Sequence, residues 1–354
     1  MSNLTLDQEI SESIEKAEPL CPVFGVCGGC SYQDISYAGE LLIKGRKLRR
    51  LFADNFDLPE DVFQAIVPSP EAYHYRNRLD LTLCKLKGNI LIGFQPASSK
   101  RLVLVDSCPI ARKEISEFIP KLQKEASAKL PVDYRRANLV VRTGDDGRVL
   151  WGGIGRRSLV LKEEDYLWTE VSGKRIFYAL DTFFQANLAI LPRLIETIRP
   201  LAHFDKETFF WDFYSGVGLF GICFADQVKG AVMIEESADS ARLAHFNVKY
   251  HGLKNIEIRE GKVERELPRK IEKFRGKRNV GFVDPPRKGL SAGALEVFAG
   301  QKKFESFFYL SCRPESLIRD LKAFWKRGWK IERVIPFDFF PRTSHLEVLV
   351  LLKP

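Results

Sequence analysis

The sequence has 354 residues, of which 45% are hydrophobic and 29% are charged. This balance excludes a disordered chain, and the length favours two folded units over one. A formal net charge of +9 favours an anionic partner such as nucleic acid. The polar first 20 residues and the lack of a long apolar run predict a cytoplasmic protein that makes no membrane contact.

Three cysteines are crowded near the start of the sequence. Cys21, Cys27 and Cys30 form a C-x5-C-x2-C pattern, and Cys108 follows later in a Cys-Pro pair. Because a cytoplasmic protein keeps its thiols reduced, this spacing favours a metal site over disulfides. Four thiolates suit zinc and an iron–sulfur cluster equally well, so the ligands alone leave both open.

A basic amphipathic helix is predicted from Ile35 to Phe52. Four leucines recur at helical spacing and define its apolar side: Leu41, Leu42, Leu48 and Leu51. Its basic residues are expected on a charged face available to RNA: Lys44, Arg46, Lys47, Arg49 and Arg50. Similar clusters lie at 156–157 and between Lys273 and Arg278. Each cluster alone is typical of a solvated surface, but together they favour nucleic acid.

Short segments rich in β-formers follow between about Phe63 and Leu180, separated by glycine-containing turns. They are LDLTLCKL, NILIGF, RLVLVD, NLVVRTG, RVLWGG and RIFYAL. This pattern predicts a mostly antiparallel, β-rich α+β domain. We assign residues 21–180 to that domain, with the cysteine site in it, and residues 1–20 to a polar lead-in.

From residue 181 to 354 apolar strands alternate with helices, which is typical of parallel βαβ units. A helix is predicted through ANLAILPRLIETIRPL, and strands at ETFFWDF, GAVMIE, IEIRE, VGFVD, ESFFYLS, WKIERVI and LEVLVLL. The fold class is therefore α/β, with a doubly wound, seven-stranded, Rossmann-like domain at residues 181–354. The ligand site of such a sheet lies at the carboxyl ends of its strands.

A glycine-containing turn joins the first of these strands to a helix. Tyr214, Gly216 and Gly218 lie in this turn, and Glu235 ends the next strand about 20 residues later. A carboxylate at that place can accept both ribose hydroxyls of an adenosine. NAD and S-adenosylmethionine both fit, and a plain tight turn also explains the glycines. A Walker loop is excluded because no Gly-Lys-Ser/Thr follows.

Two further motifs end later strands. Asp-Pro-Pro-Arg begins at Asp284, and Ser-Cys-Arg-Pro contains Cys312. An isolated cysteine is more often a buried structural thiol, and an isolated Asp is often a helix cap. Cys312 differs because it precedes a helix and adjoins Arg313, two features that lower a thiol pKa and favour a nucleophile. Acid-Pro-Pro at this place favours a base-modifying methyltransferase over a NAD-linked oxidoreductase.

With these motifs the chain resembles the RNA uracil-5 methyltransferase family, enzymes that make 5-methyluridine in 23S ribosomal RNA and in tRNA. The resemblance covers nearly the whole chain and rests on seven ordered motifs. They are the cysteine pattern with its distant Cys-Pro, Tyr75-Arg76-Asn77-Arg78, Asp181-Thr182-Phe183-Phe184-Gln185-Ala186-Asn187, the Tyr-x-Gly-x-Gly loop, Asp284-Pro285-Pro286-Arg287-Lys288-Gly289, Ser311-Cys312-x-Pro314 and Phe340-Pro341-x-Thr343-x-His345-x-Glu347.

The resemblance implies roles for individual residues. Cys312 matches the nucleophile that adds to uracil carbon 6, and Glu347 the base that removes the proton from carbon 5. The residues that match the S-adenosylmethionine site are Gln185, Tyr214, Gly216, Gly218, Glu235 and Asp284. The resemblance also implies a [4Fe-4S] cluster on Cys21, Cys27, Cys30 and Cys108, with zinc as the alternative. The chain departs from the family pattern at Ser215, Arg313 and Arg342, where cysteine, asparagine and histidine are common.

The substrate expected from the resemblance is RNA. The small barrel that begins many family members is absent from this sequence, which resembles the shorter iron–sulfur subfamily acting on 23S rRNA at uridine 747. The 23S uridine 1939 type, a tRNA T-loop enzyme and, more remotely, a non-catalytic RNA-binding assembly factor are the alternatives. We expect a monomer, a flipped uridine against Phe183 or Phe340, a supporting role for His345, and core positions for Cys84 and Cys223.

Overall fold

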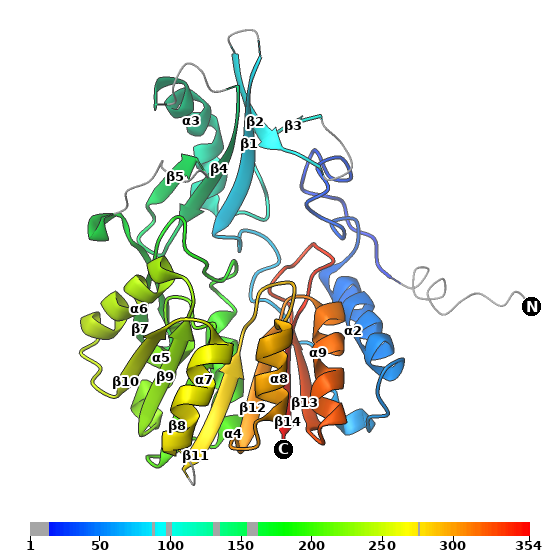
Figure 1. The fold of residues 1–354 in the computed structure, drawn as a ribbon. Coiled ribbons are helices and arrows are strands. Elements are labelled where there is room, and N and C mark those ends of the chain that lie inside the picture. Colours follow the sequence, from blue (N-terminus) through cyan, green and yellow to red (C-terminus); the bar gives the residue numbers. More distant parts are fainter. Residues whose placement is uncertain (1–13, 87–88, 97–100, 130–134, 154–161, 275–276) are drawn as a thin grey trace, which may run out of the picture.

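The computed structural model describes residues 14–86, 89–96, 101–129, 135–153, 162–274 and 277–354. They form a smaller domain with an antiparallel sheet and a larger α/β domain (Figure 1). The lead-in up to residue 13 and the expected basic residues Arg156, Arg157 and Arg275 lie outside these ranges. Within the described ranges, the helices are too short or too polar to cross a membrane.

The smaller domain is built on a five-stranded sheet in the order β3-β2-β1-β4-β5. Its strands are β1 (Arg78–Leu86), β2 (Asn89–Phe94), β3 (Val103–Leu104), β4 (Arg136–Thr143) and β5 (Val149–Gly153). Helix α3 (Lys113–Lys129) packs on one face, where alternate residues of β1 such as Leu79, Leu81 and Leu83 are buried. The predicted antiparallel domain is confirmed, although just two residues of the RLVLVD segment pair as a strand.

A two-stranded hairpin connects the smaller domain to the larger one. It consists of β6 (Leu167–Val171) and β7 (Lys174–Tyr178), paired antiparallel. Ile176 and Tyr178 are fully buried in the same hydrophobic cluster as the first helices of the large domain. The hairpin therefore belongs to the core of the large domain as much as to the smaller one.

The large domain has a seven-stranded sheet in the order β10-β9-β8-β11-β12-β14-β13. Its strands are β8 (Thr208–Phe213), β9 (Gly230–Glu235), β10 (Ile256–Glu260), β11 (Arg278–Val283), β12 (Ser306–Ser311), β13 (Lys330–Phe337) and β14 (Glu347–Lys353). One face packs on α4 (Leu191–Ala202), α5 (Leu219–Phe224) and α6 (Ala238–Tyr250), the other on α7 (Val263–Ile271), α8 (Ala292–Gly300) and α9 (Pro314–Lys326). The predicted doubly wound, seven-stranded architecture is confirmed.

The last strand corrects one detail of the prediction. In the sequence, Cys312 and Glu347 are separated by 35 positions (347 − 312), which suits one strand-helix-strand excursion between neighbouring parallel strands. Instead, β14 inserts antiparallel between β12 and β13. The chain passes through α9 and β13 before it returns, so the start of β14 lies beside the end of β12. An antiparallel neighbour brings its first residue to the edge where a parallel strand would bring its last.

Helix α2 (Tyr37–Ala53) packs against α9, beside the edge strand β13 (Figure 1). Leu48 and Phe52 join the cluster that includes α9, whereas Leu42 is 55% exposed. Lys44, expected on the charged outer face, is buried and paired with carboxylates. The predicted helix is therefore confirmed, and its apolar side in part: Leu48 is buried as expected, but Leu42 is exposed and Lys44 takes a buried place through its ion pairs.

Arg142 of β4 holds the segment between β7 and α4 by hydrogen bonds. Its fully buried guanidinium donates to the carbonyls of Ala179 and Thr182 at 2.7 Å and Phe184 at 3.3 Å. We expect Arg142→Met to lower the free energy of unfolding by about 3 kcal/mol, because three buried carbonyls lose their donor. Urea unfolding measures this, with the exposed Arg136→Met as control. Equal stability of both variants would contradict the prediction.

Candidate active site

Five polar residues gather at one edge of the large sheet. Glu235 ends β9, Tyr214 follows β8, Asp284 follows β11, Cys312 follows β12, and Glu347 begins β14. Since β9, β8, β11, β12 and β14 are consecutive in the sheet, these residues form a row along the edge. The row runs from the glycine-containing loop to Cys312 and Glu347.

The glycine-containing loop is fastened to the end of β9. Glu235 accepts hydrogen bonds from the backbone N–H of Gly216 at 2.9 Å and of Ser237 at 2.7 Å. Gly216 and Gly218 have φ of 55° and 90°, and Tyr214 has φ of 57°. A non-glycine residue in this left-handed region costs free energy, which is typical of functional loops. The space beside Gly216 is open, since an added Cβ there would have no neighbour within 4 Å.

Asp212, at the end of β8, is a residue that sequence reasoning did not single out. Its Oδ2 accepts a hydrogen bond from Gly221 N–H at 2.9 Å, and its Oδ1 is buried without a partner in the described part of the chain. Burial raises the pKa of this carboxyl to about 8. Ser215 Oγ is also buried and unpaired among the described residues. The end of β8 and the loop after it thus each hold one polar atom that a ligand could satisfy. An Asp inside an apolar strand was the available signal.

Gln185, from the segment between β7 and α4, contacts Asp284, which follows β11. Gln185 Nε2 donates to Asp284 Oδ2 at 2.8 Å. Burial raises the pKa of Asp284 to about 7, and the hydrogen bond from Gln185 opposes this shift. The two residues are 99 positions apart in sequence, so the fold of the large domain brings them together.

Cys312 opens into a cavity of about 560 Å³. Burial raises the pKa of its thiol to about 12, with further contributions from Glu347 and Asp284. The expectation of a lowered pKa from Arg313 and the helix start is therefore wrong. The Arg313 guanidinium points towards Glu315 and is largely exposed. Arg287 is the cation that opposes the shift of the Cys312 pKa.

Glu347 is 4% exposed, and its Oε2 has no hydrogen-bond partner among the described residues. Burial and the nearby Asp284 raise its pKa well above the usual value, whereas Arg287 lowers it. Such a carboxyl is suited to accept a proton within a dry site. Arg287 belongs to the Asp-Pro-Pro-Arg motif, so its residue type was visible in the sequence, but its electrostatic effect on both groups depended on the fold.

His345, Phe340 and Phe183, the ring side chains expected near this site, differ in how exposed they are. His345 lines the cavity with Cys312, and burial lowers its pKa. Phe340 is partly buried and lies with its ring centroid 5.9 Å from that of His345. Phe183 is 65% exposed. Of the two aromatic walls considered from the sequence, Phe183 is the one with a free face for stacking.

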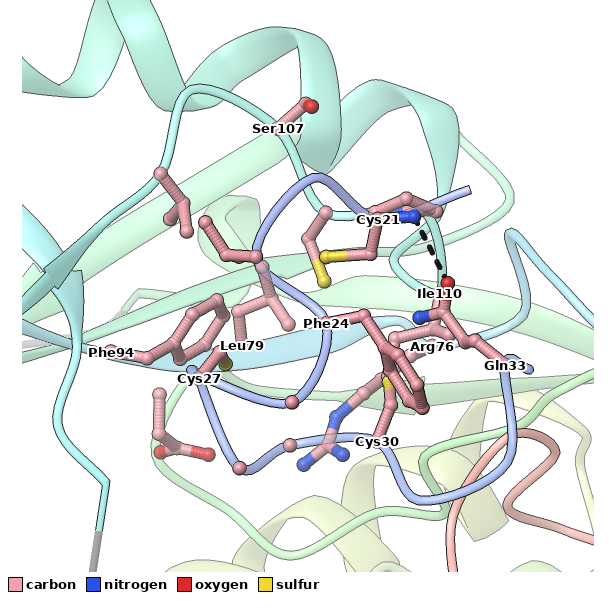
Figure 2. Close-up of a pocket in the computed structure, with 18 residues that line it drawn as sticks. Cys21, Phe24, Cys27, Cys30, Gln33, Arg76, Leu79, Phe94, Ser107 and Ile110 are labelled. Atoms are coloured by element: carbon pink, nitrogen blue, oxygen red, sulfur yellow. Dashed lines mark hydrogen bonds between the residues drawn. The ribbon is translucent and has the colours of Figure 1, made fainter. Parts of the chain in front are cut away.

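The four cysteines of the predicted metal site line one pocket of about 170 Å³ in the smaller domain. Figure 2 shows Cys21, Cys27 and Cys30 on a single loop around this pocket; Cys108, from the segment before α3, lines the same pocket. Gln33 Oε1 accepts a hydrogen bond from Cys21 N–H at 3.0 Å. The cysteines therefore converge, although in the described ranges no three His, Cys, Asp or Glu side chains have metal-binding geometry.

The comparisons with known proteins agree on one chemistry. A family model described as tRNA (Uracil-5-)-methyltransferase matches residues 152–354. A tRNA (uracil(54)-C(5))-methyltransferase of Schizosaccharomyces pombe is 29% identical, over 97% of this chain and 67% of that one. The 23S rRNA (uracil(1939)-C(5))-methyltransferase RlmD of Haemophilus parainfluenzae is 28% identical, over 98% and 85%.

The fold also matches a solved structure. It is that of the Pyrococcus abyssi tRNA (uracil-54, C5)-methyltransferase in complex with S-adenosyl-L-homocysteine. The TM-score is 0.71 at 23% identity, over 92% of this chain and 85% of that one. The likeness covers both domains and, at this identity, concerns the fold.

The raised pKa of Cys312 predicts how the thiol reacts with iodoacetamide. Because a pKa of about 12 keeps the thiol protonated near neutrality, the alkylation rate should rise about tenfold per pH unit from about pH 7 to 10. Peptide mass spectrometry can follow Cys312 separately from the buried Cys223. Glu347→Gln should accelerate the reaction at each pH, since it removes a nearby negative charge. A plateau below about pH 8 would show that the thiol pKa is not raised.

Proposed function

We propose, because this chain belongs to the tRNA (uracil-5-)-methyltransferase family of S-adenosylmethionine-dependent RNA methyltransferases, that it methylates carbon 5 of a uridine in 23S ribosomal RNA. The observation that carries the reaction is the pairing of β12 with β14, which brings Cys312 and Glu347 to neighbouring strand ends. A thiol and a base on the same edge can act in turn on adjacent ring carbons.

Cys312 is the proposed nucleophile. The thiol gives its proton to water in the open cavity, and the thiolate sulfur adds to carbon 6 of uracil; the displaced electron pair of the C5–C6 double bond makes carbon 5 an enolate carbon able to accept a methyl group. Its half-buried position in an open cavity supports this role, since a base can enter from solvent. Its high pKa in the free protein means that substrate binding must assist deprotonation. Arg287, the neighbouring cation, favours the thiolate.

Glu347 is the proposed general base. After methyl transfer, its carboxylate removes the proton from carbon 5, and the electron pair of the broken C–H bond expels Cys312 from carbon 6. The unpaired, buried Oε2 supports this role because it is free to take that proton. Asp284, with one oxygen held by Gln185, can accept a hydrogen bond from the uracil N3–H, a donor that cytosine lacks.

The glycine-containing loop is the proposed cofactor site. Its unpaired polar atoms and the open space beside Gly216 fit a bound ligand. When bound, S-adenosylmethionine supplies an electrophilic methyl group. Glu235 would hold the ribose, and the loop would approach through Gly216 and Gly218. Tyr214, Gln185 and Asp284 would complete the site; of these, Asp284 follows β11, the strand that pairs with β12.

The cysteine pocket is the proposed site of a [4Fe-4S] cluster. Four thiols around one partly apolar pocket are the donor set of such a cluster, and the same set suits zinc. Cys21, Cys27, Cys30 and Cys108 would each hold one iron. The site lies in the smaller domain, away from Cys312, so its proposed task is to shape the RNA-binding surface.

The proposed target is a 23S uridine of the 747 type. The named relatives support two alternatives: one acts on 23S uridine 1939 and another on tRNA uridine 54. Labelled S-adenosylmethionine with 23S transcripts covering either uridine, or with tRNA, distinguishes the three. Absence of transfer to all three RNAs would exclude the enzyme proposal and favour an RNA-binding assembly factor.

Replacement of the nucleophile tests the mechanism. Cys312→Ala should reduce methyl transfer to background and abolish the covalent adduct with 5-fluorouridine RNA, because no other group supplies the sulfur. A gel that resolves the denatured adduct measures this. The matched control is Cys84→Ala, another half-buried cysteine, which should retain both activities. An adduct formed by the Cys312 variant would show that another residue attacks the base.

Replacement of a pocket cysteine tests the cluster. Protein purified without oxygen should be brown and contain about four irons, and Cys30→Ser should lose the colour and the iron. Cys84→Ser is the control, since Cys84 lies in β1 and does not line the pocket. Metal analysis by emission spectroscopy gives the count. One zinc per chain without iron would identify the alternative metal.

A further inference from the structure

A buried charge network connects α2 with the segment that precedes Glu347. Lys44 Nζ lies 2.7 Å from Glu40 Oε1 and 2.7 Å from Asp338 Oδ1, and all three side chains are at most 2% exposed. Lys44 also donates to the carbonyl of Phe340 at 3.1 Å. Tyr37 donates its hydroxyl to the other oxygen of Asp338 at 2.8 Å. The Lys44 ammonium therefore has its three partners within the protein: Glu40, Asp338 and the Phe340 carbonyl.

A contribution to folding stability is a poor explanation for burying these charged side chains. Removing three charges from water costs several kcal/mol per ion, and well-packed apolar side chains of similar volume are often as stable. Burial raises the pKa of Glu40 to about 7 despite its contact with Lys44, which shows how strong the desolvation is. Such networks are better suited to fix one arrangement of two elements than to stabilise them.

The element held by the network is residues 338–346, which we call the catalytic loop. It joins β13 to β14 and ends at Glu347. The network fastens it at Asp338, at the Phe340 carbonyl and at the backbone N–H of Arg342, which donates to Glu40 Oε1 at 2.8 Å. Fixing alternate residues leaves this part of the loop little freedom.

Arg342 is the second fastening point. Its Nη1 donates to the Ile35 carbonyl at 3.0 Å, and its own carbonyl accepts from the N–H groups of Ser31 and Tyr32 at 2.7 and 3.2 Å. Its φ is 66°, in a region that non-glycine residues adopt only when the surroundings enforce it. The cysteine loop and the catalytic loop are thereby joined at one residue.

The catalytic loop reaches the active site directly. Ser344, His345 and Leu346 line the cavity that holds Cys312, and Lys44 also lines it. The next residue is Glu347, whose carboxylate is buried beside Asp284. A displacement of the loop would therefore move the proposed base while Cys312, on β12, stays in place.

We propose that Glu40, Lys44, Asp338 and Arg342 are positioning residues that hold the catalytic loop so that Glu347 faces carbon 5 of the Cys312-bound uracil. This inference rests on the proposed function. Since Glu347 acts after Cys312 has added, a loosened network slows proton removal but leaves the addition intact. The covalent RNA adduct then accumulates.

The experiment compares Lys44→Met with a triple variant, E40Q/K44M/D338N. The single variant leaves two buried carboxylates without the Lys44 ammonium that they share and risks unfolding, whereas the triple variant removes all three charges at similar volume. The control is Lys326→Met, which removes one exposed positive charge from the last turn of α9, at the opposite edge of the sheet. Thermal unfolding confirms that each variant is folded.

For the triple variant we expect kcat to fall about 10- to 100-fold, with KM for RNA unchanged and a denaturation-resistant adduct on ordinary uridine RNA. Arg342→Met should act in the same direction. Lys326→Met should match the wild type. A rise in KM for RNA at unchanged kcat would show that Lys44 binds RNA instead. Equal losses of adduct and methylation would show that the network has only a general structural role. Either this result or a rise in KM for RNA at unchanged kcat would overturn the inference.

A measurement that does not depend on catalysis can test this inference separately from the proposed function. Hydrogen exchange should show faster exchange at residues 338–346 in the triple variant, with β12 unchanged. If the wild type transfers no methyl group, the proposed function fails, and exchange alone decides whether the network holds the loop. Unchanged exchange in this segment would overturn the positioning role whatever the activity.

Discussion

The pairing of β14 between β12 and β13 is the constraint on which the active site depends. A purely parallel sheet would carry the start of every strand to the edge opposite the ligand site. The antiparallel insertion reverses this for the last strand. Glu347 begins β14, and Cys312 follows β12, so the two meet at one edge. The catalytic loop, which joins β13 to β14, leads directly into Glu347 and therefore helps to set the position of that residue.

The electrostatics of this edge follow from burial. Asp284, Glu347 and the Cys312 thiol all have raised pKa values, chiefly because they are buried, and the charge of Asp284 adds to the shift at Glu347 and at Cys312. Arg287 partly offsets the accumulated negative charge on Glu347 and Cys312. In the free protein the raised pKa therefore keeps the thiol protonated near neutrality.

Two long-range connections tie the smaller domain to this edge. Arg142, in the antiparallel sheet, binds the segment that leads to Gln185. Arg342, in the catalytic loop, binds the chain on either side of the turn after Cys30. Both use a guanidinium that donates to backbone carbonyls, a geometry that lysine cannot reproduce. Hydrogen bonds of Arg342 thus connect the cysteine loop to the catalytic loop, although the cysteine pocket and the cavity at Cys312 are separate.

The linear order of residues was sufficient to indicate the two domains, the strands of the large sheet and the chemical type of each strand-end residue. These depend on local periodicity and on residues such as Cys312 that sit beside recognisable strand ends. The direction of β14, the burial of Lys44 and the raised pKa of the Cys312 thiol depended on the tertiary structure. Each arises from contacts between segments far apart in the chain, which desolvate a group or pair it with a partner that no local pattern reveals.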